Sequence, residues 1–243
     1  WRVRWRRSTR AQRPAGAAPQ IDNGGTLHTY RLAVAATGEF TAQNGGTVVA
    51  ALAAINTTVM GINAIYAVEV SIKLSLINNE NAIIYTDVTS QVGSPARPYT
   101  TQNINNLILE NQSNLDTVIG NGSYDIGQVF DASNASGGAA GLASISSVCD
   151  SSRKGRGTSG GNSVILAAHE MGHQFGATHT FNDSVNGSCG SFNGSNQRTA
   201  ESAYEPGSGS TIMSYGGTCG AADLQLIRDT YFHIRSLEQI VAY

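Results

Sequence analysis

The apolar positions of residues 45–65 recur every three or four residues, at Val48, Leu52, Ile55, Val59 and Ile62. Side chains with this spacing lie on one face of an α-helix. The pattern therefore predicts a long amphipathic helix between Gly45 and Ile65 that packs on a hydrophobic core.

The period changes to two directly afterwards. In residues 68–77 polar positions alternate with Val68, Val70, Ile72, Leu74 and Leu76, a pattern typical of a strand with one face in water. Shorter apolar runs predict strands at residues 31–37, 82–88, 124–130 and 140–147. A second helix is predicted over residues 101–119, with an inward face of Ile104, Leu107, Ile108 and Leu115. Strands and helices in this order indicate an α/β (α+β) fold, with helices packed on a mixed sheet.

The periodic spacing of apolar residues is lost after Thr180. Residues 181–210 are rich in glycine, serine and asparagine, and a segment of this length without periodicity is either functional or held by a cross-link. Ser236 and Gln239 have the spacing of a capping box, so we expect a short C-terminal helix to begin there.

Composition limits the class of protein. The chain has 243 residues, of which 40% are hydrophobic and 13% charged, and this is enough for one core or for two lobes that share a cleft. No run approaches eighteen consecutive apolar residues, so we expect no membrane span.

The charge is unevenly distributed. Six of the 15 basic residues precede the first acidic one, Asp22, which leaves nine basic against 17 acidic residues and a net charge of −8 for the rest of the chain. A basic arm with two tryptophans could bind nucleic acid or an anionic surface. Residues 11–20 are of low complexity, however, so residues 1–20 are interpreted as a basic flexible leader or the remnant of a pro-segment, with no nucleic-acid partner.

The three cysteines, Cys149, Cys189 and Cys219, allow one disulfide and leave one thiol. No CxxC pair is present, which excludes a zinc ribbon. A bridge between Cys189 and Cys219 would join two loops that have little else to hold them, and we predict that pairing. It would imply an oxidising compartment.

The segment HEMGHQFGATH, residues 169–179, holds the candidate chemistry. Ser163 can cap a helix whose apolar stripe is Val164, Ala168, Met171 and Phe175. His169 and His173 are four residues apart, so their Cβ atoms lie about 5–6 Å apart and both rings can reach one zinc at roughly 2.0–2.1 Å. Glu170 is rotated by about 100° from His169 and can hold a water molecule instead of binding the metal.

His179 can join the same ion only if the chain turns back after the helix. Gly176 permits that turn, because glycine adopts a positive φ without a steric penalty and commonly follows a helix C-terminus. Three nitrogen ligands leave zinc one open position, which is the mark of a catalytic site.

The pattern HExxHxxGxxH resembles the signature of the metzincin clan of zinc endopeptidases. The segment GSGSTIMSYGG, with Met213 thirty-four residues after His179, is similar to the turn that carries a methionine beneath the metal in that clan. Tyr215 matches the position where astacins, serralysins and pappalysins carry a tyrosine that can reach the zinc.

Residues 141–153, GLASISSVCDSSR, resemble the adamalysin (reprolysin) segment in which an edge strand is followed by a cysteine and an aspartate. Thr180 and Phe181 follow the third histidine, where adamalysins place an aspartate and some pappalysins do not. The mixture is similar to bacterial reprolysin-like secreted metalloproteases. The resemblance implies a metzincin-like catalytic domain: a mixed twisted sheet with an antiparallel edge strand and two long helices in an upper subdomain (residues 21–179), and an irregular lower subdomain (residues 180–243) with a C-terminal helix.

The resemblance also implies a function. One catalytic Zn²⁺ would bind His169, His173 and His179, with Glu170 as general base and Tyr215 as a partner of the oxyanion. The edge strand would pair with an extended protein or peptide substrate through Gly141, Leu142 and Ala143. We expect a secreted, monomeric endopeptidase.

One alternative to the endopeptidase remains at the level of sequence. A catalytically silent peptide-binding or adhesion module would carry the same zinc without cleaving its ligand.

Residues 182–196 are rich in oxygen donors, but they lack the spaced carboxylates of a Ca²⁺ site, so calcium is not supported and a flexible loop is expected. His28 and His233 are isolated, and we expect neither to be a metal ligand.

Overall fold

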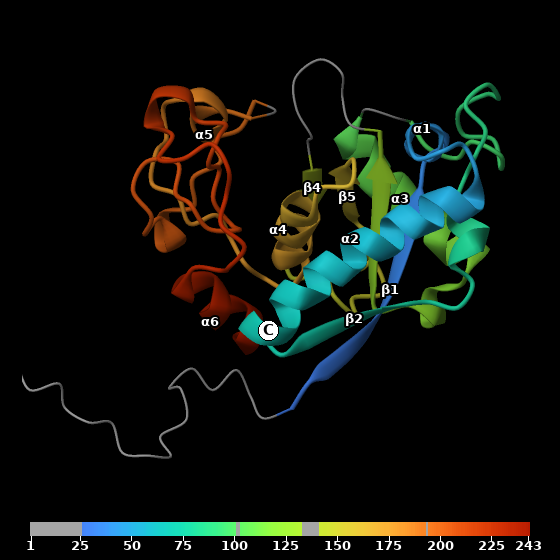
Figure 1. Cartoon of the computed structure of the whole chain (residues 1–243), viewed down its shortest axis with the longest axis horizontal. Coiled ribbons are helices and arrows are strands. Elements are labelled where there is room, and N and C mark those ends of the chain that lie inside the picture. The colour runs from blue at the N-terminus through green and yellow to red at the C-terminus, as the bar shows by residue number, and fades with distance from the viewer. Residues whose placement is uncertain (1–25, 101–102, 133–140, 193) are drawn as a thin grey trace, which may run out of the picture.

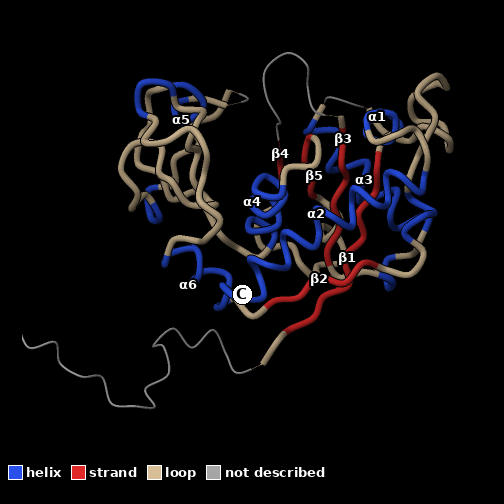
Figure 2. Tube along the Cα trace, viewed as in Figure 1, coloured by secondary structure: helices blue, strands red, loops and turns tan. Residues whose placement is uncertain are grey.

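A five-stranded sheet forms the centre of the molecule (Figures 1 and 2). The structure is a computed structural model that describes residues 26–100, 103–132, 141–192 and 194–243, so the predicted leader at residues 1–20 lies outside the described residues. The sheet order is β2-β1-β3-β5-β4, and only β4 runs antiparallel to its neighbour. The strands are β1 (His28–Ala36), β2 (Ile72–Leu76), β3 (Ile126–Asp131), β4 (Gly141–Ala143) and β5 (Gly157–Gly160). The expected mixed sheet with an antiparallel edge strand is confirmed.

Helices cover both faces of the sheet. Helices α2 (Val48–Glu69) and α4 (Val164–Gln174) pack on one face, and α3 (Ile104–Val118) packs on the other. The alternation of β1 makes this possible, because Leu32, Val34 and Ala36 enter the first core while Ala33 and Ala35 enter the second. The two long helices of the predicted fold are therefore α2 and α3.

One described helix, α2, is long and apolar enough to cross a membrane by length and composition alone. In this fold it is a core helix, because Ile55, Val59 and Ile62 are buried against the sheet.

The prediction of a strand at residues 68–77 was wrong at its start. Helix α2 continues to Glu69, and the amide of Val70 still donates to the carbonyl oxygen of Tyr66 at 3.0 Å. The alternation at Val68 and Val70 therefore belongs to the last helical turn. The N-terminal boundary also differs, because α2 begins at Val48 behind a Thr47 cap instead of at Gly45.

The prediction of a strand at residues 82–88 was also wrong. A 3₁₀-helix, η1 (Glu80–Ile83), stands there, and only Ile84 forms a bridge with β1, at Ala36. The cause is Glu80, whose carboxylate accepts the amide of Val34 on β1 beyond the end of β2. A side chain thus takes the place of a neighbouring strand.

Other boundaries moved by a few residues. The strand predicted at residues 140–147 is limited to β4, since Ser146 takes a positive φ of 53°. The C-terminal helix α6 (Ile234–Ala242) begins before Ser236, because the His233 side chain caps it by accepting the amide of Arg235 at 3.1 Å. Short α1 (Gly38–Gln43) and β5 gave no periodic signal, and β5 consists of the residues GTSG.

We expect replacement of Glu80 by Gln to stabilise the protein at alkaline pH. Burial raises the pKa of Glu80 to about 8, although the hydrogen bond from the Val34 amide acts to lower it. The other carboxyl oxygen, Oε2, has no hydrogen-bond partner among the described residues. The stabilising contribution of the protonated carboxyl is complete below the unfolded-state pKa and is lost as the pH rises towards 8. Urea unfolding at pH 5 and pH 8 should show a relative gain for Glu80→Gln on the order of 3 kcal/mol at the higher pH. An equal difference at both pH values would contradict this.

The C-terminal part has little regular structure (Figure 1). Besides α6, its described elements are α5 (Gly187–Gly190) and the 3₁₀-helices η3 (Ala200–Ser202) and η4 (Gly220–Ala222). Cys189 and Cys219 form a disulfide, as predicted, and Cys149 is free. The bridge is buried with Phe181 in a small third core, against which Tyr215 packs.

We expect the double replacement Cys189→Ser/Cys219→Ser to lower the free energy of unfolding by about 3–4 kcal/mol, because the bridge closes a long loop. The sequence separation of the two cysteines is 30 residues. Denaturant unfolding of this variant and of Cys149→Ser would measure the effect, with the free thiol as the matched control. Unfolding midpoints that agree for the two variants would rule out a stabilising bridge.

Candidate active site

Helix α4 carries two of the three histidines. Ser163 caps it as predicted, since its side-chain oxygen accepts the amide of Leu166 at 3.2 Å. His169 and His173 are one turn apart on the same face, and both are buried. The face that holds the two rings therefore points into the protein and not to bulk water.

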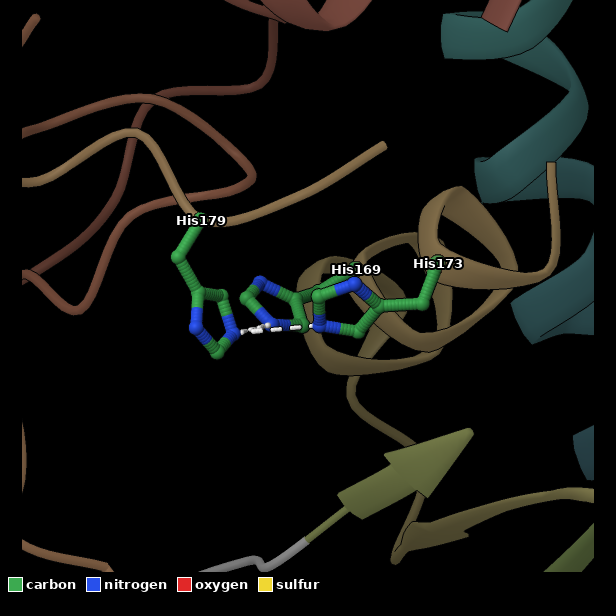
Figure 3. Close-up of side chains that lie close together, drawn as sticks. All are labelled: His169, His173 and His179. Carbon is green, nitrogen blue, oxygen red and sulfur yellow. Dashed lines mark hydrogen bonds between the residues drawn. The ribbon is translucent and has the colours of Figure 1, made fainter. Parts of the chain in front are cut away.

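The chain reverses at Gly176 as the sequence predicts. Its φ is 94°, its amide donates to the carbonyl oxygen of His173 at 2.8 Å, and the amide of Ala177 donates to that of Gly172 at 2.9 Å. These two hydrogen bonds form a Schellman motif, the usual end of a helix followed by glycine. The turn sends His179 back towards the helix (Figure 3).

The three imidazoles converge through their Nε2 atoms (Figure 3). The Nε2 of His179 lies 3.2 Å from that of His169 and 3.1 Å from that of His173. Nitrogen ligands at 2.0–2.1 Å from a tetrahedral zinc lie roughly 3.3–3.4 Å apart. The observed spacing is thus close to the spacing that zinc requires.

The opposite ring nitrogens are all bound to backbone carbonyls. The Nδ1 atoms of His169, His173 and His179 lie 2.7 Å from the carbonyl oxygens of Ile212, Ala177 and Gln197, respectively. Each Nδ1 must therefore carry the proton, and each Nε2 presents a lone pair to the other two. Three converging lone pairs repel one another unless a cation lies between them, so this donor set fits Zn²⁺.

Burial favours the neutral form that a metal ligand needs. Desolvation lowers the pKa of His173 to about 4 and that of His179 to about 3. It also lowers the pKa of His169, whose side chain is buried. All three rings are therefore neutral at pH 7, the form in which imidazole can bind a metal.

Glu170 is 4% exposed and lies against the edge strand. A Cβ atom on Gly141 would lie 2.3 Å from Oε1 of Glu170, so the backbone of β4 contacts the carboxylate directly. Burial raises the pKa of Glu170 to about 8, and the positive charge of Arg228 acts in the opposite direction. Its carboxylate and the three histidines all line a cleft of about 340 Å³.

Met213 is fully buried and lies against helix α4 at Gly172. A Cβ atom on Gly172, between the two helical histidines, would lie 2.7 Å from the Met213 sulfur. Tyr215 packs on His179, with ring centroids 4.6 Å apart, and its hydroxyl lies 3.4 Å from Oε1 of Gln197. Burial raises the pKa of Tyr215, so the phenol remains a hydrogen-bond donor.

The cleft is bounded by the free edge of the sheet. Gly141, Leu142 and Ala143 all line it. The amide of Ser144 donates to the carbonyl oxygen of Arg156, which directly precedes β5, at 2.9 Å. In an antiparallel pair every second residue directs its main-chain groups to the partner strand, so those of Ser144 and Leu142 point towards β5. Those of Gly141 and Ala143 consequently face the open edge.

Some residues of the site could not be found from the sequence. The carbonyl oxygens of Ile212, Ala177 and Gln197 orient the histidines, but any residue supplies a carbonyl, so no residue type marks them. Gln197 follows the stretch predicted to be a flexible loop. Gly172 could have been noticed as a glycine within a helix, where it is unfavourable unless another group approaches closely.

The family model described as metallo-peptidase family M12B, reprolysin-like, matches residues 26–241. No curated protein matches the chain. A chain of a solved structure described as "Structure of a chaperone-substrate complex" is similar at a TM-score of 0.47 and 15% sequence identity. The match covers 88% of this chain and 33% of that chain, so the present chain spans about a third of that chain's length.

Proposed function

The chain belongs to the reprolysin-like M12B family of metallopeptidases, and on this premise we propose that it is a zinc-dependent endopeptidase that hydrolyses peptide bonds of extended protein substrates. One observation carries the proposal. Three buried imidazoles direct unprotonated Nε2 atoms at one point, with every Nδ1 bound to a carbonyl. A buried carboxylate, Glu170, lines the same cleft.

The residues of the site divide the reaction among them. His169, His173 and His179 would hold the zinc, which supplies a Lewis acid for the attacking water and the scissile carbonyl. Glu170 takes the proton from that water and returns it to the leaving amine. Tyr215 donates a hydrogen bond from its phenol hydroxyl to the oxyanion that forms on the carbonyl oxygen. The open edge of β4, at Gly141 and Ala143, pairs with the substrate backbone and keeps it extended.

We also propose that the enzyme works in an oxidising environment outside the cytoplasm. The buried disulfide between Cys189 and Cys219 supports this, because such bonds persist where thiols are not kept reduced.

Digestion of casein or gelatin tests the function, with and without the chelator 1,10-phenanthroline, and mass spectrometry identifies the cleaved bonds. We expect internal cleavage that the chelator abolishes and added Zn²⁺ restores. A protein that binds one equivalent of zinc and cleaves neither substrate would support the catalytically silent binding module instead. Cleavage that survives removal of the metal would contradict the proposed mechanism.

A further inference from the structure

The segment that carries Met213, residues 210–214, is held on its amide side by one buried carboxylate. Oε1 of Glu205 accepts the amides of Ser210 at 2.8 Å and Thr211 at 3.0 Å. Oε2 accepts the hydroxyl of Thr211 at 2.7 Å and that of Thr180. Glu205 is 7% exposed, and its four donors lie on two segments that are far apart in the sequence.

The carbonyl side of the same segment is held by Arg228. Its Nη1 donates to the carbonyl oxygens of Ile212 at 3.3 Å and Ser214 at 3.2 Å, the residues on either side of Met213. Within the part of the chain that the structure describes, no carboxylate forms an ion pair with Arg228. The hydrogen bonds of Arg228 to residues 210–214 are therefore not a by-product of a salt bridge that positions the guanidinium.

Both contacts lead to metal ligands. The carbonyl oxygen of Ile212 accepts the Nδ1 hydrogen of His169 at 2.7 Å, so Arg228 and His169 share one acceptor, and Nη1 of Arg228 also lies 3.2 Å from that Nδ1. On the other side Thr180 directly follows His179. Its amide donates to the carbonyl oxygen of Met213 at 3.1 Å, and its carbonyl oxygen accepts the amide of Glu205 at 2.8 Å. Displacement of residues 210–214 would thus disturb the support of two of the three histidines.

We propose that Glu205 and Arg228 are positioning residues that clamp residues 210–214 from opposite sides and thereby fix the separation of His169 and His179. The inference rests on the proposed function only in that these histidines bind a metal. Neither side chain touches the reacting atoms. A carboxylate suits the amide side because it accepts on both oxygens, and a guanidinium suits the carbonyl side because it carries donors only.

Zinc affinity tests the clamp without any use of peptidase activity. Glu205→Gln and Arg228→Met are compared with Glu80→Gln, which alters another buried carboxylate remote from the histidines. Zinc binding is measured by competition with a fluorescent chelator, ligand geometry by the visible spectrum of the Co²⁺-loaded protein, and stability by the melting temperature of the metal-free protein. We expect a 10–100-fold loss of affinity in each clamp variant, with an altered Co²⁺ spectrum, and no change in Glu80→Gln. Arg228→Lys, which keeps charge and donor, should recover part of the loss.

Each outcome is informative. Clamp variants that bind zinc as tightly as the unaltered protein would overturn the proposal, whatever their melting temperature. Should Glu205→Gln fail to fold, Thr211→Val removes one hydroxyl donor of the carboxylate without a change of charge, and unchanged affinity there would also overturn it. Absence of zinc binding in the unaltered protein would instead refute the proposed function.

Discussion

We expect Glu170→Gln to lower kcat by about 10²–10⁴-fold, the range that a general acid–base residue contributes, and to leave the zinc affinity unchanged. Glutamine has nearly the same shape as glutamate, so it should fit beside Gly141 where the carboxylate now lies. It cannot take a proton from water, however. Because the three Nε2 atoms face one another without Glu170 among them, removal of its charge leaves the ligand set intact.

Cleavage of a quenched fluorescent peptide measures kcat and KM, and the bound zinc is quantified in the same preparation. Glu201→Gln is the matched control, because this carboxylate is exposed on the short helix η3 and lines no part of the cleft. We expect KM to change little, since the loss arises in the chemical step. Near-normal turnover in Glu170→Gln, with zinc bound, would show that another group is the base.

The part of the site that follows from local geometry could be predicted. Spacing of four residues brings His169 and His173 together on any helix, and glycine at position 176 permits the reversal that returns His179. The pairing of Cys189 with Cys219 could likewise be anticipated from their places in loops with few other constraints. These features depend on neighbours along the chain or on chemistry with few choices.

Features that depend on distant contacts could not be predicted. Residues 82–88 have the composition of a strand, yet Glu80 occupies the hydrogen-bonding edge of β1 and leaves room for a single bridge. The residues GTSG of β5 form a strand only because β3 and β4 flank them. Glu205 and Arg228 stand in irregular segments, where charged side chains are normally exposed, so neither could be distinguished from a surface residue before its partners were known.

We expect Gly141→Ala to reduce kcat/KM by on the order of 10²-fold, the effect of a catalytic group displaced by about 1 Å. The added methyl carbon would lie 2.3 Å from Oε1, 2.6 Å from Cδ and 2.7 Å from Cγ of Glu170. All three distances are below van der Waals contact, so the carboxylate or the strand must move. Gly122→Ala, where a Cβ atom meets nothing within 4 Å, is the control for the loss of a glycine.

The double variant Gly141→Ala/Glu170→Gln separates displacement of the base from loss of substrate pairing. If the methyl group acts by moving Glu170, it should have little further effect on kcat once the carboxylate is gone. The fold-loss in kcat of the double variant will then be smaller than the product of the two single losses. If it acts by disturbing the edge of β4 that faces the substrate, the losses will multiply and KM will rise. Peptide cleavage by the two single variants and the double variant therefore decides between these roles of Gly141. Purely multiplicative losses would reject the contact with Glu170 as the reason that this position is glycine.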